Sequence, residues 1–440
     1  MDIYNNFGLF ERALRLKKEL TLDNVASDLG MSRAFLSYAE NGQKTLRKED
    51  FIRFLEYYEI EFNFDSSIIS EIYSYLDELV IALIYRNRER ENEIAKLITD
   101  NRIRYTYSLG SFYLPIIDTY LTIHGILDLS SQERSKIFSE GDSFLPLYSE
   151  DEKALFTFIK ARYVKEKNKI PLSVQLYNQA LVFLSGRQWP QLQGIIKISL
   201  ALALAAQSSF FKAYEITKEA HDLFTRYSNY IQALACQNNI VNFLIGMQCY
   251  EEAEKIIHEI FMSKKSFADP LMYDYTTRTM FLTLILQEKF KETIEFSKKH
   301  RQKFENGFIG NFCLVPYCYY RMGAFDACLQ EIQILSKEKP TADDKALFAL
   351  LKAIIRNDKA GIEKEKQRME KICCKQYNWW MLMVLYQLMT YYYSLEDEKD
   401  LLIDAYKKQL MVFRHKLPIL DLPAPSFELS YIDNQSESGV

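Results

Sequence analysis

The residues best suited to contact a partner lie in a short polar run near the N-terminus, "LGMSRAFLSYAENGQKTL", residues 29–46. An arginine can donate two hydrogen bonds to a guanine edge in the major groove, and small hydroxyl groups can reach a base or a phosphate. Lysine and glutamine side chains suit the phosphate backbone. The chemistry that this run could do is therefore the binding of double-stranded DNA. The candidate DNA contacts are Ser32, Arg33, Ala34, Ser37, Tyr38, Gln43 and Lys44.

A second set of residues, far along the chain, could bind a peptide. Asn238 and Asn242 are spaced by one helical turn, and each amide can donate to and accept from a peptide backbone. Arg162 and Arg278 could take carboxylates. A neighbouring helix could instead satisfy both asparagines as core amides, and the two interpretations stay open. The candidate peptide contacts are Arg162, Asn238, Asn242, Arg278, Leu282, Tyr317 and Tyr320.

The remaining reactive residue types form no pattern that chemistry would need. No triad, metal-ligand set or phosphate loop is present, so we expect no enzyme activity, no cofactor and no metal. The seven cysteines are odd in number and lack ligand spacing, and we expect buried, reduced thiols. The histidines are expected to be packing residues. The cysteines are Cys236, Cys249, Cys313, Cys318, Cys328, Cys373 and Cys374, and the histidines are His124, His221, His258, His300 and His415.

Length and composition favour long helices. The chain has 440 residues with only 14 glycines and 10 prolines, and so few breakers favour helices over a sheet. The net charge is −4, so DNA binding would depend on where the charges lie. The first ten residues lack the features of a signal peptide. The longest apolar stretch, residues 198–206, is half the length needed to span a bilayer. We expect a cytoplasmic protein with no membrane partner.

The candidate DNA contacts are predicted to lie on a compact set of four helices. Thr21 and Ser32 are natural N-caps for the second and third of them. Gly30 ends the second helix, because a positive φ is cheap only for glycine, and Asn41–Gly42 closes the third. The second and third helices form a helix-turn-helix, whose second member enters the major groove. The predicted inner faces are Leu9, Phe10, Ala13, Leu14 and Leu16; Val25, Ala26 and Leu29; Phe35, Leu36 and Ala39; and Phe51, Phe54, Leu55 and Tyr58.

Beyond residue 150 a helical-pair repeat emerges. An aromatic residue or isoleucine is followed three positions later by a small residue, which would let the second helix of each pair lie against the first. Such solenoids bind extended peptides on the face that their first helices line. Two further helical hairpins are expected at 342–375 and 376–415. The repeated pairs are Ile170/Ser173, Phe210/Ala213, Tyr250/Ala253, Phe290/Thr293 and Phe325/Cys328.

We therefore predict an all-α fold, with an N-terminal helix-turn-helix domain followed by a right-handed, tetratricopeptide-like helical solenoid. The predicted boundaries are 1–64 for the helix-turn-helix domain, 65–149 for a linker of first helical hairpins, 150–416 for the peptide-binding solenoid and 417–440 for a C-terminal tail.

The first fifty residues resemble the phage-repressor-like (XRE, Cro-type) helix-turn-helix family, through "TLDNVA" and "LGMSRAFLSYAENG". One departure is Leu22, because the family often has a glutamine there that contacts phosphate. The order of this domain and the repeats resembles the RRNPP group (Rap, Rgg, NprR, PlcR and PrgX) of cytoplasmic peptide-pheromone receptors. The resemblance implies a homodimeric quorum-sensing transcription regulator that binds a short signalling peptide. It also implies that asparagines on the first helices, here Asn238 and Asn242, hold the peptide backbone.

Two other functions stay open at this point. Rap members of the group act on the phosphorylation of a response regulator, or sequester a protein, through helices ahead of the repeats. Polar groups there include Glu78, Glu93 and Gln132. The chain could also be a repressor that a protein partner controls through the same groove. The helix-turn-helix itself could serve only for packing or dimerisation.

Overall fold

The computed structural model describes residues 6–207, 209–263, 270–300, 312–338, 340–375 and 379–413. Over these ranges the chain consists of helices joined by short turns, and the extended pairing that they contain is one isolated bridge between Asn63 and Ser108. The all-α prediction is confirmed. The chain divides into two compact units, one ending at Leu200 and the other beginning at Ala201. The predicted boundaries after residues 64 and 149 both fall inside the first unit.

The first unit holds the helix-turn-helix and the helices that follow it. Its elements are α1 (Phe7–Lys17), α2 (Leu22–Asp28), α3 (Arg33–Glu40), α4 (Lys48–Tyr58), α5 (Ser67–Tyr85), α6 (Arg88–Asp100), α7 (Arg102–Thr106), η2 (Ser111–Tyr113), α8 (Leu114–Ile123), α9 (Ser131–Phe144), η3 (Leu145–Leu147), α10 (Glu150–Glu166) and α11 (Ile170–Phe183), and α12 (Leu192–Ala205) crosses the division between the units.

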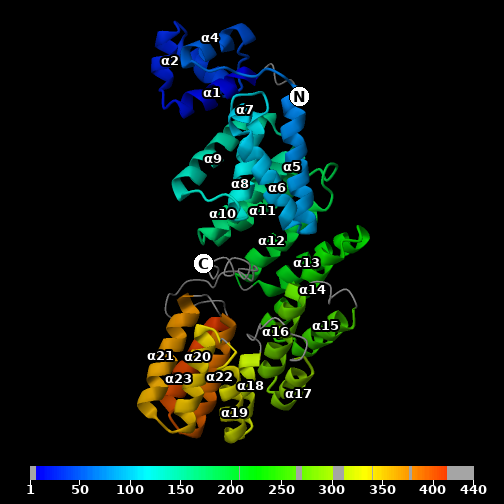
Figure 1. Cartoon of the computed structure of the whole chain (residues 1–440), viewed down its shortest axis with the longest axis vertical. Helices are drawn as coiled ribbons and strands as arrows, with labels where there is room; N and C mark the ends of the chain where they lie inside the picture. The colour runs from blue at the N-terminus through cyan, green and yellow to red at the C-terminus, as the bar shows by residue number, and fades with distance from the viewer. Residues whose placement is uncertain are drawn as a thin grey trace. The chain divides into compact units, whose positions relative to one another are not determined.

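The second unit continues the helical pairs (Figure 1). Its elements are α13 (Phe210–Arg226), α14 (Tyr230–Gly246), α15 (Tyr250–Met262), α16 (Pro270–Leu286), α17 (Phe290–His300), η5 (Phe312–Leu314), α18 (Val315–Arg321), α19 (Phe325–Leu335), α20 (Ala342–Ile355), α21 (Lys359–Lys375), α22 (Trp379–Leu395) and α23 (Lys399–Phe413).

The predicted caps of the helix-turn-helix are confirmed. Thr21 Oγ1 accepts a hydrogen bond from the Asn24 amide at 3.2 Å, and Ser32 Oγ accepts one from the Phe35 amide at 3.1 Å. Gly30 has a φ of +64°, which permits the tight turn between α2 and α3. These local choices fix where the leading end of α3 begins.

The predicted inner faces of these helices are largely confirmed, with one error. Leu16 was placed in the core but is exposed, whereas its neighbour Arg15 is buried. Arg15 turns inward because Glu40 on α3 pairs with it, and a buried charge requires such a partner. The hydrophobic pattern of α1 alone did not indicate this exchange.

The helix-turn-helix packs against later helices of the first unit. The Phe10 ring centroid lies 6.3 Å from that of Phe112 and 5.7 Å from that of Phe144. Lys17 Nζ lies 3.0 Å from Glu140 Oε1, which links α1 to α9. Aromatic contacts of this kind join α1 to the unit through a shared apolar core.

The repeat register predicted from the sequence is confirmed. Each of α11, α13, α15, α17 and α19 begins at the predicted aromatic or isoleucine residue. The small residue three positions later has an exposed fraction of 0% in all five helices, as close helix packing requires. The two further hairpins are α20–α21 and α22–α23, drawn in yellow to red-orange in Figure 1. The buried small residues of α11, α13, α15, α17 and α19 are Ser173, Ala213, Ala253, Thr293 and Cys328.

The cysteines are free thiols, and six of them are buried as expected. Cys249 is exposed, so the expectation of burial is wrong there. It is the N-cap residue of α15, and that position faces solvent because it precedes the packed part of the helix. In the described part of the chain, no cluster of ligand side chains could hold a metal ion, and no helix is long and apolar enough to cross a membrane.

Candidate DNA and peptide interfaces

The predicted DNA contacts gather on the outer side of α3 and on the turn that follows it. Six of the seven predicted residues are exposed, and Ser37 is half-buried. The opposite side of α3 is buried through Leu36 and Ala39. This division leaves the leading end of α3 free to approach a groove.

Two contacts on this surface were not anticipated from the sequence. The Arg33 side chain forms an exposed ion pair with Asp23 on α2, with Nε 2.6 Å from Oδ1. The Lys44 ammonium lies 5.6 Å from the Tyr38 ring centroid and 5.9 Å from that of Phe35. Exposed ion pairs of this kind contribute little to stability, so Arg33 can exchange Asp23 for a base edge at small cost.

A buried polar network holds α3 against α1. Arg15 donates from Nε and Nη2 to the two oxygens of Glu40, both at 2.7 Å, and from Nη1 to the Leu20 carbonyl at 2.8 Å. The Tyr58 hydroxyl donates to Glu11 Oε1 at 2.7 Å. The bidentate pair fixes the orientation of α3 because both of its oxygens are committed.

Glu11 is an unusual acid in this network. Burial, together with the neighbouring negative charge of Glu40, raises the pKa of Glu11 to about 8 from its ordinary value of 4.5. Tyr58 and Arg15 oppose this shift. Glu11 is therefore protonated at neutral pH, and the core of the helix-turn-helix carries one carboxylate, that of Glu40, for the Arg15 charge.

The two asparagines of the predicted peptide site are both buried on α14. Asn238 donates to the Leu234 carbonyl at 3.2 Å and accepts from the Thr276 hydroxyl at 3.0 Å. Asn242 donates to the Tyr275 hydroxyl, but its Oδ1 is buried and has no hydrogen-bond partner. The next first helix, α16, supplies both hydroxyls. Asn238 thus has the contacts of a core amide, whereas Asn242 keeps an unused acceptor.

The other predicted peptide contacts divide between the two units. Leu282, Tyr317 and Tyr320 are buried in the core of the second unit. Arg278 lies on α16, and its side chain is outside the described residues. Arg162 lies on α10 in the first unit. The structure does not gather all seven residues into one described cavity.

Arg162 contacts His124, a histidine that the sequence predicts to be a packing residue. Its Nη1 lies 2.9 Å from His124 Nε2, and His124 Nδ1 lies 3.1 Å from Glu91 Oε1. Since a guanidinium can only donate, Nε2 accepts and Nδ1 carries the proton. Burial lowers the pKa of His124, and the charge of Arg162 lowers it further against the effect of Glu91. His124 is therefore a neutral link between α6, α8 and α10.

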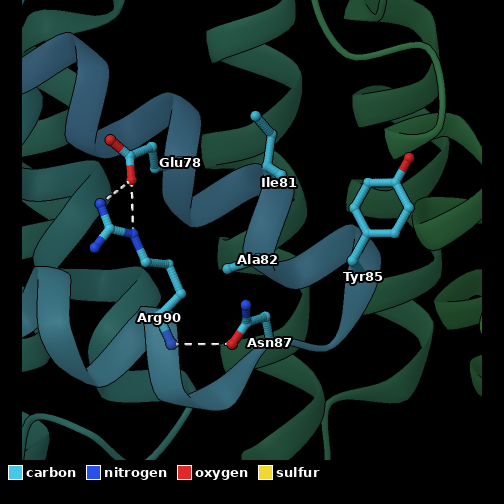
Figure 2. A pocket seen from close by; sticks show the side chains of 6 residues that line it. All are labelled: Glu78, Ile81, Ala82, Tyr85, Asn87 and Arg90. Atoms are coloured by element: carbon cyan, nitrogen blue, oxygen red, sulfur yellow. Dashed lines mark hydrogen bonds and ion pairs between the residues drawn. The ribbon is translucent and has the colours of Figure 1, made fainter.

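A shallow pocket of about 350 Å³ lies between α5 and α6. Figure 2 shows Arg90 turned toward Glu78, with Nε 2.7 Å from Glu78 Oε2. Arg90 also donates to Glu93 Oε2 at 2.6 Å. Both acids named as candidates for phosphoryl chemistry are therefore ion-paired. Exposed Ile81 and Tyr85 form the apolar wall.

The partners of the candidate residues are what sequence reasoning missed. Tyr275 and Thr276 lie 33 and 38 residues after the asparagines that they contact. That separation is close to the repeat length. Hydroxyl residues at the equivalent positions of the next repeat could therefore have been identified from the sequence as partners of the asparagines. Arg321 follows the predicted contact Tyr317 by one helical turn on α18.

Comparison with known proteins now places this architecture. Residues 7–61 match the family described as a helix-turn-helix domain. Among solved structures, the apo form of RapI has a TM-score of 0.60 at 10% identity, over 79% of this chain and 98% of that chain. The apo form of the quorum sensor NprR from B. thuringiensis has a TM-score of 0.56 at 14% identity, over 78% of this chain and 99% of that chain.

The chain therefore combines a helix-turn-helix domain with a helical-repeat fold like that of RapI and NprR. At these identities the likeness establishes the fold alone. A third similar structure, aspartyl phosphate phosphatase F from Bacillus subtilis, has a TM-score of 0.54 at 14% identity, over 80% of this chain and 96% of that chain. No curated protein matches the chain.

Proposed function

We propose that the chain is a cytoplasmic transcription regulator of the RRNPP type that binds operator DNA through α3 and the turn after it. The observation that carries this proposal is the two-sided character of α3. Its leading side is exposed and offers Arg33, while its other side is buried and anchored by Glu40. Arg33 would read a base edge, and Lys44 would contact the phosphate backbone.

The test is a mobility-shift titration with duplexes selected from a random-sequence pool. Arg33→Ala should cost about 1–3 kcal/mol at the selected site and relax its sequence preference. Lys44→Ala should weaken binding to all duplexes to a similar degree. Selection of no preferred sequence, or an unchanged affinity for Arg33→Ala, would overturn the assignment of α3.

We propose further that a short signalling peptide binds along the first helices of the repeats. Among the described residues of the second unit, three buried polar atoms on such helices have no partner: Asn242 Oδ1 on α14, Arg321 Nε on α18 and Gln387 Oε1 on α22. Unpaired buried groups of this kind are costly, and a polar ligand would offset that cost. One similar structure is a Rap protein complexed with Competence and Sporulation Factor, with a TM-score of 0.55 at 11% identity.

The peptide proposal is tested by isothermal titration of the full chain with short synthetic peptides encoded in neighbouring reading frames. Binding of one peptide, with scrambled peptides inert, supports it. A regulator that a protein partner controls would bind none of them. Light scattering tests the accompanying homodimer, since one small helix-turn-helix supplies few contacts alone. A monomer both free and on its DNA would exclude a dimeric regulator.

A second candidate function is action on a response-regulator protein, as a phosphatase or by sequestration. The likeness to aspartyl phosphate phosphatase F and the pocket beside Glu78 favour keeping it. This function predicts that the chain shortens the lifetime of a phosphorylated response regulator or binds it. It also predicts that Glu78→Ala abolishes the effect while DNA binding is unchanged.

A further inference from the structure

Arg321, the last residue of α18, occupies an aromatic cage in the second unit. Its side chain is only 7% exposed. The guanidinium carbon lies 4.2 Å from the Tyr391 ring centroid and 4.7 Å from that of Phe290. The Tyr317 hydroxyl accepts a hydrogen bond from Nη1 at 2.7 Å. The aromatic faces and the hydroxyl hold a planar cation in one orientation.

The hydrogen bonds of this guanidinium are incomplete on one edge. Nη2 donates to Glu288 Oε1 at 2.6 Å, whereas Nε is buried and has no partner. Nε and Nη2 form an edge that matches the two oxygens of a single carboxylate. Glu288 uses this edge with one oxygen only, and its side chain is 58% exposed. The exposed Glu288 carboxylate therefore satisfies Nη2 of this edge and leaves Nε without an acceptor.

A second unpaired group lies on the helix that supplies part of the cage. Gln387 precedes Tyr391 on α22 by one turn. Its Nε2 donates to the Ile285 carbonyl at 3.3 Å, but its Oε1 is buried without a partner. The second unit therefore offers an unused donor on Arg321 and an unused acceptor on Gln387. A peptide carries the complements of both, a carboxylate and backbone N–H groups.

We propose that Arg321 anchors a carboxylate of the bound peptide, and that Glu288 occupies this anchor until the peptide arrives. The carboxylate is the C-terminal one or that of an Asp or Glu side chain. The proposal rests on the peptide-binding function above. When the peptide binds, Glu288 leaves Nη2 and turns to water, and the peptide carboxylate accepts from both Nη2 and Nε. One carboxylate replaces another, so no additional uncompensated charge is buried.

The test is the capture of heptapeptides by the immobilised full-length protein, with quantification by mass spectrometry. Three random libraries are compared: one with a free C-terminus and no Asp or Glu, one amidated with Asp and Glu, and one amidated without them. The wild type should retain the first or the second roughly tenfold or more above the third. Which of the two is retained identifies the source of the carboxylate.

Two variants and a control separate the anchor from general charge effects. Arg321→Lys keeps the positive charge but loses the pair of donors, Nε and Nη2, that matches a carboxylate. It should reduce the preference for the carboxylate-containing library by roughly tenfold. Glu288→Gln removes the competing carboxylate from an exposed position, and should strengthen retention of the preferred library several-fold. Arg368→Lys, at an exposed ion pair with Glu365, should change nothing.

The outcomes distinguish this proposal from the function on which it rests. Equal retention of all three libraries by the wild type overturns the carboxylate anchor and leaves peptide binding intact. Retention of no library overturns both. If Arg321→Lys does not fold, Glu288→Gln decides, because an unchanged or weakened carboxylate preference in that variant overturns the displacement of Glu288.

Discussion

Replacement of Glu40 by glutamine should loosen α3 and weaken the DNA binding that we propose for it. The change is nearly isosteric, but it leaves the charge of Arg15 buried with only a neutral acceptor and turns an amide donor toward the guanidinium. The side chains of Arg15 and Glu40 are 9% and 4% exposed. Loss of one partner from a pair buried to this degree costs about 3–5 kcal/mol. We expect the lower end, about 3 kcal/mol, because Glu11 can ionise and take part of the charge of Arg15 once Glu40 is neutral.

The assay is hydrogen exchange of the full chain, followed by mass spectrometry for segments of α1 to α4. A loss of about 3 kcal/mol corresponds to roughly hundredfold faster exchange in α3. Asp23→Asn is the matched control, since it breaks the exposed pair with Arg33 and should cost at most about 0.5 kcal/mol. Arg15→Met combined with Glu40→Leu should recover most of the protection, because apolar residues can replace a buried pair. Wild-type exchange in Glu40→Gln would refute the anchoring role of this pair.

Three further outcomes follow from the geometry. Folded Glu11 keeps its proton to about pH 8 whereas the unfolded chain releases it near 4.5, so the stability that it contributes is fully present below pH 4.5 and is lost as pH rises to about 8. The protection factors of the α1 amides, which are hydrogen-exchange rates corrected for the intrinsic effect of pH, should fall over that window, and fall much less in Glu11→Gln. Asn242→Ala loses the hydrogen bond to Tyr275 but also removes an unpaired acceptor, so the free energy of unfolding should change by less than about 1 kcal/mol. Calorimetry should show peptide affinity falling about tenfold or more, whereas a lower melting temperature with intact affinity would indicate a core role. Asp23→Asn frees Arg33 and should raise affinity for the selected DNA in mobility shifts, and a loss of affinity would contradict the exchange proposed for Arg33.

The elements of this fold were predictable because their signals are local. A cap such as Ser32 is set by the few residues beside it, and its hydroxyl meets the amide three positions on. The repeat register was equally visible, since a small residue such as Ala213 recurs wherever two helices of a pair must meet closely. Periodicity carries this information without any knowledge of distant contacts.

The site was less predictable because it depends on which helices meet. Whether Asn238 faces a ligand or a neighbour is decided by Thr276, one repeat away. The inward turn of Arg15, where the pattern placed Leu16, depends on Glu40 on another helix. The aromatic cage of Arg321 joins three helices, and no local pattern marks it. Polar contacts across repeats are therefore where sequence reasoning reached its limit.

The seam between the helix-turn-helix and α9 has a consequence for how such proteins diversify. Phe10 packs on Phe112 and Phe144, and the backbone of Asn63 pairs with that of Tyr107 and Leu109. Removal of the helix-turn-helix domain by a cut after residue 64 would expose these rings to water and break the backbone pairing of Asn63. A different helix-turn-helix domain fused to α5 would need aromatic residues that pack on Phe112 and Phe144 in the same way. The DNA specificity proposed for this chain should therefore change by substitutions on the outer side of α3 more readily than by exchange of the whole helix-turn-helix domain.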